Sequence, residues 1–245
     1  MSLVAEKSCQ LPSRDYLRKK LLPHKGQEWR ESWTKEVTDK LLVLPIALLG
    51  LVPASLIPLA IKLDDGGPIF YKDRRVGKNG QEIFVYKFRS MKIGNDATPE
   101  SLLYYQGFDN DNDSRLTKVG RFIRQIDIDE FPQVIQILLG QLALVEFRAI
   151  EQNAIDNLEN AMSEPNFKKW LTKKLIGKQG VYDPSIGKIN NPRSDLEKIP
   201  FQLDYAENAS LIKDLEIYMF INMSILKKIT KKIKNGIKKK AVLQT

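Results

Sequence analysis

Two adjacent carboxylates, Asp129 and Glu130, have the residue types and the setting for phosphoryl chemistry. They precede Phe131-Pro132 and an apolar run, and acids and a proline are typical of the first turn of a helix. At such an N-terminus an ionised aspartate is available as a nucleophile, and the extra charge of a phosphorylated aspartate is favoured. Glu130 can bind Mg²⁺, which prefers one or two carboxylates together with phosphate oxygens. An acidic pair here is also an ordinary helix cap, so both interpretations stay open.

Basic side chains surround this pair along the chain. Arg121 and Arg124 stand one to two helical turns upstream, where they could steady a transferring group. Residues 69–76 and 81–88 are rich in β-formers and are separated by Gly-Lys-Asn-Gly, which predicts a β-hairpin with an Asn-Gly turn. Alternation along its strands is expected to aim several cations at a shared phosphate, from the set Lys72, Arg74, Arg75, Lys87 and Arg89. A solvated strand face is the alternative.

The composition removes other chemistries. His24 is the only histidine and Cys9 the only cysteine, so a zinc site, a Ser-His or Cys-His pair and an internal disulfide are not expected. Any metal should be a hard cation, Mg²⁺, held by carboxylates. The formal charge of +9 favours an anionic partner but does not choose among phospholipid, nucleic acid and phosphorylated substrate.

Two predicted helices hold the acidic pair between them. Val119, Phe122, Ile123 and Ile126 recur at helical spacing and predict an amphipathic helix that stops near Asp127. A second helix is predicted to begin around residues 129–132, to present apolar residues from 134–139 and to end at Gly140.

Residues 41–61 form an uncharged, apolar segment of 21 residues, long enough to cross a bilayer core. Pro45, Pro53 and Pro58 predict a kink or break near its middle, and Gly50 adds a flexible point. Cations flank both ends, which places both ends on the cytoplasmic side: Arg14, Arg18, Lys19, Lys20, Lys25, Arg30, Lys35 and Lys40 precede it, and Lys62, Lys72, Arg74 and Arg75 follow. A re-entrant helix satisfies this pattern; a membrane-spanning helix and a buried core helix are the alternatives.

The C-terminal segment carries a second membrane signal. Isoleucine recurs every fourth residue from Ile225 to Ile237, and lysines fill most of the other positions. The pattern predicts a basic amphipathic helix in an anionic interface. From these residues alone, a solvated lysine tail or a nucleic-acid-binding arm is an open alternative.

Several motifs, in order, resemble the bacterial monotopic phosphoglycosyl transferases, also called sugar transferases or undecaprenyl-phosphate sugar phosphotransferases. The resemblance runs from about Lys35 to Leu215. It rests on Asp39 and on residues 62–64 (Lys-Leu-Asp), 67–70 (Gly-Pro-Ile-Phe), 75–80 (Arg-Val-Gly-Lys-Asn-Gly), 86–91 (Tyr-Lys-Phe-Arg-Ser-Met), 114–124 (Ser-Arg-Leu-Thr-Lys-Val-Gly-Arg-Phe-Ile-Arg) and 129–133 (Asp-Glu-Phe-Pro-Gln).

The resemblance implies an α+β monotopic membrane protein on the cytoplasmic face of the bacterial inner membrane. A re-entrant helix broken near Pro53 would lead into a small, mainly helical catalytic domain with a β-hairpin and then a basic amphipathic C-terminal helix. The expected divisions are a basic extension (1–34), the membrane helix (35–63), the catalytic domain (64–215) and the tail (216–245).

The resemblance also implies a mechanism. In that family the aspartate matching Asp129 attacks the β-phosphate of a UDP-sugar, releases UMP and becomes a covalent phosphosugar. Polyprenyl phosphate then takes up the phosphosugar, and the glutamate matching Glu130 helps to bind Mg²⁺. Candidate phosphate-binding and substrate-binding residues are Lys72, Arg75, Lys87, Arg89, Arg121, Arg124, Arg148 and Asp204.

The chain departs from the family pattern near the nucleotide site. Where Gly-Pro-Arg-Pro is usual it has Glu146-Phe147-Arg148-Ala149, which loses two stiffening prolines and is expected to bring the Glu146 charge close to a diphosphate. Residues 140–142 lack the usual Asp after Gly, and residues 175–177 replace Arg-Pro-Gly. Leu203-Asp204-Tyr205 resembles a shortened Leu-Asp-x-x-Tyr region, which makes Asp204 a candidate.

The leading prediction is a transferase that starts a surface polysaccharide or glycoconjugate, with downstream glycosyltransferases as possible partners. The alternative is a catalytically impaired relative that serves as a membrane-bound scaffold. A nucleic-acid-binding protein would draw on charge alone, and because no recognition-module pattern is present, no nucleic-acid partner is expected.

Overall fold

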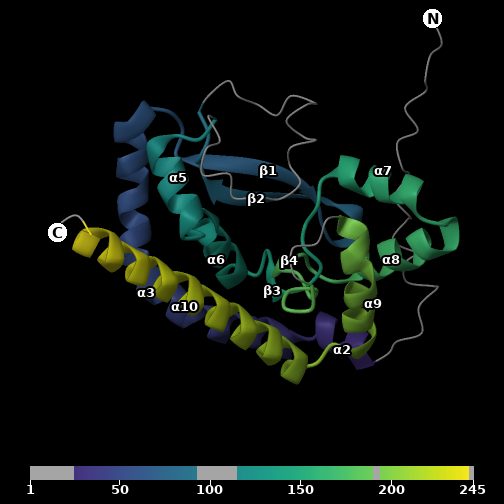
Figure 1. Ribbon diagram of the computed structural model, residues 1–245. Coiled ribbons are helices and arrows are strands. Elements are labelled where there is room, and N and C mark those ends of the chain that lie inside the picture. Colours follow the sequence, from purple (N-terminus) through teal and green to yellow (C-terminus); the bar gives the residue numbers. More distant parts are fainter. Residues whose placement is uncertain (1–24, 93–114, 190–193, 243–245) are drawn as a thin grey trace, which may run out of the picture.

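The structure is a computed structural model that describes residues 25–92, 115–189 and 194–242 (Figure 1). Helices predominate, with two small sheets. The order along the chain is α2 (Lys25–Glu31), α3 (Trp33–Asp65), β1 (Phe70–Val76), β2 (Glu82–Phe88), α5 (Lys118–Gln125), α6 (Phe131–Leu138), β3 (Ala143–Val145), α7 (Gln152–Ala161), α8 (Glu164–Ile176), β4 (Gly180–Tyr182), α9 (Ile199–Asn208) and α10 (Leu211–Val242), with short 3₁₀ turns η1 (Lys78–Gly80), η2 (Ile128–Glu130) and η3 (Asp195–Lys198). The mixed helix and sheet composition agrees with the predicted α+β class.

The predicted β-hairpin is confirmed. β1 and β2 pair antiparallel in a register that runs from Phe70 opposite Phe88 to Val76 opposite Glu82. Asn79 in the connecting turn has a φ of 57°, a left-handed conformation that asparagine tolerates better than most residues. The backbone N–H of Val76 donates to the carbonyl of Ile150 at 3.0 Å, so the turn end of the hairpin is tied to the rest of the domain.

A second sheet was not predicted. β3 and β4 pair in parallel, with Ala143 opposite Gly180 and Val145 opposite Tyr182. Both strands have only three residues, and parallel strands far apart in sequence leave no hairpin signal.

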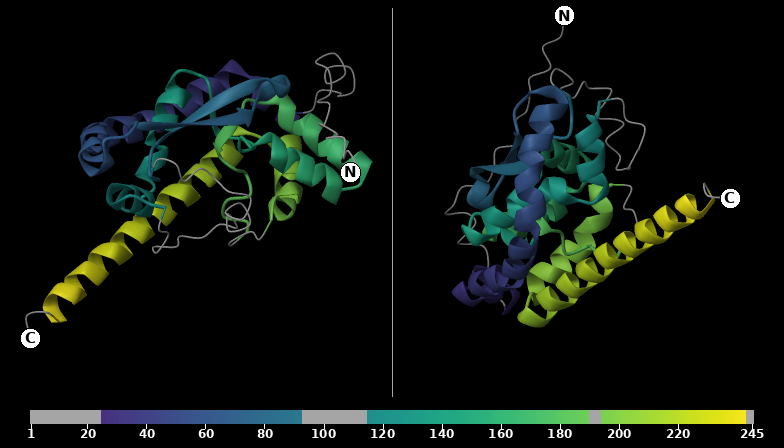
Figure 2. Two further views of the ribbon diagram at one scale, coloured as in Figure 1. Left: turned by 90° about the horizontal axis from the view of Figure 1, so that it is seen from above. Right: turned by 90° about the vertical axis from the view of Figure 1, so that its left-hand side faces the viewer.

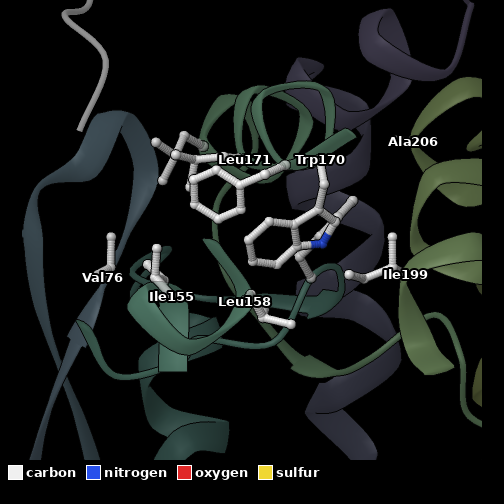
Figure 3. Close-up of a cluster of buried hydrophobic side chains, with 10 residues drawn as sticks. Val76, Ile155, Leu158, Trp170, Leu171, Ile199 and Ala206 are labelled. Atoms are coloured by element: carbon white, nitrogen blue, oxygen red, sulfur yellow. The ribbon is translucent and has the colours of Figure 1, made fainter. Parts of the chain in front are cut away.

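One buried hydrophobic cluster joins the hairpin, α7, α8 and α9. Figure 3 shows Trp170 at its centre, with Val76 of the hairpin on one side and Ile199 of α9 on the other. The indole N–H of Trp170 donates to the Gln202 Oε1 at 2.7 Å, so the polar atom of this buried ring is satisfied. The cluster fixes one side of the domain, where the loop that follows β3 lies.

Helix α3 is continuous but bent. Ser32 caps its start by accepting a hydrogen bond from the Lys35 N–H, and Gly66, with a φ of 72°, ends it. Pro45, Pro53 and Pro58 lie inside the helix, and Figure 1 shows its second half turning upward, toward α5 and β1. The expected interruption is therefore a bend, which the internal prolines explain, and helical structure continues through it.

Both halves of α3 pack on the domain. Val43 of the first half belongs to a buried cluster with Ile217 of α10. Ile57 and Ile61 of the second half pack with Phe88 of β2 and Ile123 of α5. Because α3 is bent, both of its halves pack against the same domain.

The opposite face of α3 is apolar and exposed. Leu49 has 81 % of its surface exposed and Leu63 79 %, and the same face includes Leu41, Leu48, Leu51, Val52, Leu56 and Leu59. α3 is the one helix in the described part of the chain that is long and apolar enough to cross a membrane. So much exposed leucine contradicts the alternative of a buried core helix.

The long C-terminal helix is confirmed as far as its backbone. α10 runs from Leu211 to Val242, and Figure 2 shows its C-terminal part extending beyond the rest of the molecule. The predicted division between residues 215 and 216 falls inside this helix. The side chains of Ile229, Ile233 and Ile237, on which the amphipathic prediction rests, lie outside the described part.

A buried polar junction ties the start of α3 to α10. The Lys35 Nζ donates to Asp214 at 2.8 Å and to Asp39 at 3.2 Å, and all three side chains are almost completely buried. Asp214 also accepts from Trp29 at 2.8 Å and from Tyr205 at 2.6 Å. One lysine between two carboxylates therefore holds elements that are distant in sequence.

Candidate active site

The acidic pair lies in the turn between the two predicted helices. Asp129 and Glu130 belong to the 3₁₀ turn η2, and α6 begins at the next residue, Phe131. Asp127, which precedes the turn, has a left-handed φ of 56°. Neither predicted helix is displaced, since α5 and α6 match the expected positions. Glu130 occupies the N-cap position of α6, but its side chain forms no capping hydrogen bond to the helix N-terminus.

Glu130 is the most strongly paired acid in this turn. Its Oε1 accepts a hydrogen bond from the Lys87 Nζ at 2.7 Å and a second from the Arg148 Nη2. Burial opposes ionisation, but the charges of Arg148 and Lys87 outweigh it and lower the pKa of Glu130 to about 2. Glu130 is therefore a fixed anion at neutral pH, and it brings together cations from β2 and from the loop after β3.

Asp129 has the opposite electrostatic environment. Burial and the neighbouring charge of Glu130 raise the pKa of Asp129 to about 6, against the lowering effect of Lys87 and Arg124. The helix terminus was expected to keep this carboxyl readily ionised; its pKa is instead raised, although at pH 7 most of it is still ionised. A carboxylate of raised basicity close to cations suits a nucleophile.

Arg124 is placed by hydrogen bonding to the end of the hairpin. Its Nε donates to the Ser90 Oγ at 2.8 Å, and its charge acts on Asp129. α5 itself is anchored by Asp64 at the end of α3, whose Oδ2 accepts the Val119 N–H at 2.9 Å. The Lys-Leu-Asp motif after the apolar segment thus has a structural role at the N-terminus of α5.

Gly120 permits the close approach of α5 to this strand end. A Cβ at this position would overlap the Ser90 carbonyl oxygen and lie 2.6 Å from its carbon. We expect Gly120→Ala to destabilise the protein by about 2 kcal/mol or more through overpacking. Thermal unfolding in detergent would measure this, with Lys118→Ala at an exposed position of the same helix as the control. Stabilisation by about 1 kcal/mol, the ordinary gain from alanine in a helix, would contradict the contact.

The loop that carries Arg148 is held by buried polar contacts. Glu146 is 1 % exposed and accepts two hydrogen bonds from Arg30, at 2.6 and 2.8 Å. The Lys174 Nζ donates to the Arg148 carbonyl at 2.7 Å and to Gln179 at 2.9 Å. The expectation that Glu146 brings a negative charge to a diphosphate is therefore wrong, because its charge is buried and paired with Arg30 on the core side of the loop.

Three predicted phosphate-binding residues of the hairpin lie apart from the pair. Lys72 is on the other face of the hairpin from Lys87, with its Nζ 3.6 Å from the centre of the Phe84 ring. Arg75 shares the Lys87 face, but it is ion-paired with Asp73 at 2.5 Å and with Glu151 at 3.3 Å.

Arg89 is buried and ties the strand end to the end of α3. It donates from its Nε to the Pro68 carbonyl at 2.7 Å and pairs with Asp65. Strand alternation was the basis for grouping these cations, but in the observed register it puts Lys72 and Lys87 on opposite faces of the hairpin, so the expected grouping is not found for this pair.

The remaining candidates are Arg121 and Asp204. Arg121 is exposed on α5, and no ion pair joins it to the acidic pair among the described residues. Asp204 is exposed on α9 and pairs with Lys213 at 2.8 Å, whereas its neighbour Tyr205 is buried in the junction with Asp214. The structure thus brings together Asp129, Glu130, Lys87, Arg124 and Arg148. Within the described part of the chain, no hydrogen bond or ion pair joins the acidic pair to Lys72, Arg75, Arg89, Arg121 or Asp204.

Two residues near the site had no sequence signal. Burial and the charge of Glu130 raise the pKa of Tyr182 to about 12, so its phenol keeps its proton. Lys174 is fully buried on α8, and burial lowers its pKa to about 8. Tyr182 lies on β4 and Lys174 on α8, and both are far along the chain from residue 130. Their proximity to the site could therefore not be predicted from the sequence alone.

Comparison with known proteins identifies the family of the chain. The model of the family described as "Bacterial sugar transferase" matches residues 30–228. The chain is 30 % identical over 193 residues to the UDP-glucose:undecaprenyl-phosphate glucose-1-phosphate transferase of Xanthomonas campestris, covering 78 % of this chain and 38 % of that protein. It is 37 % identical over 183 residues to galactosyl transferase CpsE of Streptococcus agalactiae, covering 72 % and 38 %.

A relative of more similar length is the exopolysaccharide production protein ExoY of Rhizobium meliloti. It is 30 % identical over 186 residues, which cover 72 % of this chain and 78 % of ExoY. The chain thus spans less than half the length of the first two relatives and most of the third. The family match covers the bent helix, the hairpin, the acidic turn and the Arg148 loop, and the chain therefore belongs to the bacterial sugar transferase family.

Proposed function

We propose that this protein transfers a sugar 1-phosphate from a UDP-sugar to polyprenyl phosphate, through a covalent intermediate on Asp129. The observation that carries the proposal is the acidic turn itself, where one carboxylate of raised pKa lies beside another that Lys87 and Arg148 neutralise. The name of the Xanthomonas campestris relative, which specifies transfer of glucose 1-phosphate from UDP-glucose to undecaprenyl phosphate, supports the substrate class. The product would start a surface polysaccharide or glycoconjugate.

The reaction proceeds in two displacements. In the first, an Asp129 carboxylate oxygen forms a bond to the β-phosphorus of the donor, and the bond from that phosphorus to the bridging oxygen breaks, so that UMP leaves with the electron pair. In the second, a phosphate oxygen of polyprenyl phosphate attacks the same phosphorus. The aspartyl–phosphorus bond breaks, the carboxylate is regenerated, and polyprenyl diphosphate sugar is released.

The cations around Glu130 have distinct tasks in this scheme. Lys87 and Arg148 approach Glu130 from two elements, and in this scheme they also bind the donor phosphates. Arg124 acts on Asp129 from α5, where it favours the ionised nucleophile. Cations fixed before the reaction stabilise charge that develops on the phosphoryl oxygens.

Mg²⁺ fits this site only together with substrate. No group of three or more metal-binding side chains is found in the described part of the chain. Both cations contact Oε1 of Glu130, so Oε2 is the oxygen left to a metal, and phosphate oxygens would complete the shell. When bound, Mg²⁺ would neutralise charge on the diphosphate as UMP leaves.

We propose that α3 is re-entrant and that the domain rests on the cytoplasmic leaflet. Three features support this topology: the bend, the packing of both halves of α3 on one domain, and the exposed leucines on the outer face. Exposed apolar side chains on α10, among them Met219, Phe220 and Leu226, extend the lipid-facing surface, and the lysines that follow in sequence suit anionic lipid.

Single cysteines would test the topology. In a Cys9→Ser background, Thr34→Cys and Lys62→Cys flank the apolar segment at exposed positions. Both are expected to react with a membrane-impermeant maleimide only when it reaches the cytoplasmic side, as in inverted vesicles. Labelling of the two cysteines from opposite sides would show a spanning helix instead.

Release of UMP would test the activity. Purified protein in bilayer nanodiscs, given a panel of UDP-sugars with Mg²⁺ and polyprenyl phosphate, is expected to release UMP from at least one donor. Folded protein that releases no UMP and acquires no label from any donor would favour the scaffold function. The buried contacts of Glu146 and Lys174 speak against that alternative, since they hold the loop that lacks the family prolines.

Arg148 offers a quantitative check of the site. We expect Arg148→Ala to lower kcat/KM by about 10²-fold, because one fixed donor to the phosphoryl group is removed. Arg148→Lys should recover only part of the loss, since lysine cannot form the same planar fork. Arg74→Ala is the control, because Arg74 is 77 % exposed and pairs with Glu82 on the hairpin surface. Equal effects of Arg148→Ala and Arg74→Ala on kcat/KM would show that Arg148 is not part of the site.

A further inference from the structure

The inward face of α3 has only small side chains where the helix passes the acidic turn. Val43, Ala47, Ala54, Ile57 and Ile61 are buried along this face, and the half-buried Gly50 lies between Ala47 and Ala54 at the same helical spacing. Large side chains occupy both ends of the face, but the middle has only Ala47, Gly50 and Ala54. This narrow stretch coincides with the region between the two halves of the bent helix.

The Phe131 ring fills the space at Gly50. A Cβ on Gly50 would overlap the Phe131 Cε2, and it would lie 3.0 Å from Cδ2 and 3.2 Å from Cζ. Phe131 also packs against the buried cluster that contains Ile57 and Ile123. The glycine therefore permits close packing of the Phe131 ring, a role that its sequence context did not indicate.

Phe131 is covalently joined to the proposed catalytic pair. It directly follows Glu130, and its backbone N–H donates to the Ile128 carbonyl, which closes the 3₁₀ turn that contains Asp129. A shift of the ring would therefore move the turn. The neighbouring residues on α3, Leu49 and Leu51, are 81 % and 56 % exposed on the outer face.

We propose that Gly50 and Phe131 are positioning residues, whose contact fixes the Asp129–Glu130 turn against the membrane helix. The inference rests on the proposed function for its activity readout, but the contact itself can be tested separately. If this proposal holds, the residues that control turnover include part of the apolar segment as well as those that bind the phosphates. The geometry of α3 would then affect turnover.

Size complementation in full-length protein tests the proposal. Gly50→Val is expected to lower kcat on the order of 10²-fold at saturating UDP-sugar and polyprenyl phosphate, because a displacement of about 1 Å at a nucleophile has such an effect. The KM for UDP-sugar should change little. Leu51→Val places the same β-branched residue on the exposed face and is expected to leave kcat nearly unchanged.

The decisive variant is Gly50→Val combined with Phe131→Leu. The smaller side chain at 131 makes room for the valine, so the double variant is expected to recover kcat nearly to the level of Phe131→Leu alone. Wild-type kcat in Gly50→Val, or a double variant as slow as Gly50→Val, would overturn the proposal. If Gly50→Val does not fold, Gly50→Ala with and without Phe131→Leu makes the same comparison.

An activity-independent probe separates this inference from the proposed function. With 4-fluorophenylalanine in place of Phe131, the ¹⁹F resonance is expected to move on Gly50→Ala and to stay in place on Leu51→Ala. A ¹⁹F chemical shift that is unchanged by Gly50→Ala would refute the contact even if the enzyme is active. Wild-type protein without UMP release would refute the proposed function while the ¹⁹F shift still decides the contact.

Discussion

Asp129→Asn is expected to lower kcat by about 10⁴-fold or more, because the amide cannot form the ester bond to phosphorus. Asparagine has nearly the same shape, so the 3₁₀ turn and its packing should persist. UMP release and covalent labelling by radioactive UDP-sugar should both disappear. Loss of one without the other would separate donor hydrolysis from formation of the intermediate.

Asp127→Asn is the matched control for this variant. Asp127 lies two residues earlier and has a left-handed φ of 56°, which asparagine adopts readily. The Asp127→Asn substitution removes a negative charge directly before the same turn and leaves the proposed nucleophile unchanged, so turnover should change by no more than a factor of a few. Undiminished turnover in Asp129→Asn, or equal losses in both variants, would refute Asp129 as the nucleophile.

Lys35→Met is expected to have the largest effect on stability, a loss of about 3–5 kcal/mol, because it removes the one cation between two buried carboxylates. Asp214 would keep its hydrogen bonds from Trp29 and Tyr205, but Asp39 would lose its ion pair and keep only the Leu144 N–H at 3.0 Å. Thermal or denaturant unfolding in detergent would measure the change.

Lys40→Met provides the comparison for Lys35→Met. Lys40 is a lysine of the same helix whose side chain is 36 % exposed and pairs with Glu36 at 2.9 Å. Surface pairs of this kind contribute about 0.5 kcal/mol or less, so this variant should unfold almost as the wild type does. If both variants lose the same stability, the buried junction does not hold α3 to α10.

Local patterns predicted the elements around the site well. The β-former runs and the Asn-Gly turn gave the hairpin its place, because turn geometry and strand alternation are local properties. The spacing of Val119, Phe122 and Ile123 predicted α5, and the Phe131-Pro132 start and the Gly140 end predicted α6. The acids were expected at the start of the second helix, and they lie in the 3₁₀ turn directly before it.

Pairings between residues far apart in the chain could not be predicted from the sequence. Arg30 and Glu146 are separated by 116 residues, and neither position has a periodicity that points to the other. Without that pairing, Glu146 was expected beside the diphosphate instead of in the core. The parallel pairing of β3 with β4 and the placement of Lys174 under the Arg148 loop are likewise set by tertiary packing.

Ion pairs with residues distant in sequence explain why some predicted site residues lie elsewhere. Charge and motif position drew attention to Arg75 and Asp204, but each has an ion-pair partner that no local pattern reveals: Glu151 for the arginine and Lys213 for the aspartate. Gly50 shows the converse case. Its role depends on the Phe131 ring, so its sequence context suggested only flexibility.

The central claim is that Asp129 carries the phosphosugar between the two displacements. Mass spectrometry of protein incubated with UDP-sugar and Mg²⁺, without polyprenyl phosphate, tests it most directly. The expected result is an added mass of one sugar phosphate that peptide mapping assigns to Asp129 and that disappears when polyprenyl phosphate is supplied. An adduct on another side chain, or UMP release dependent on polyprenyl phosphate with no adduct at any time, would contradict the account.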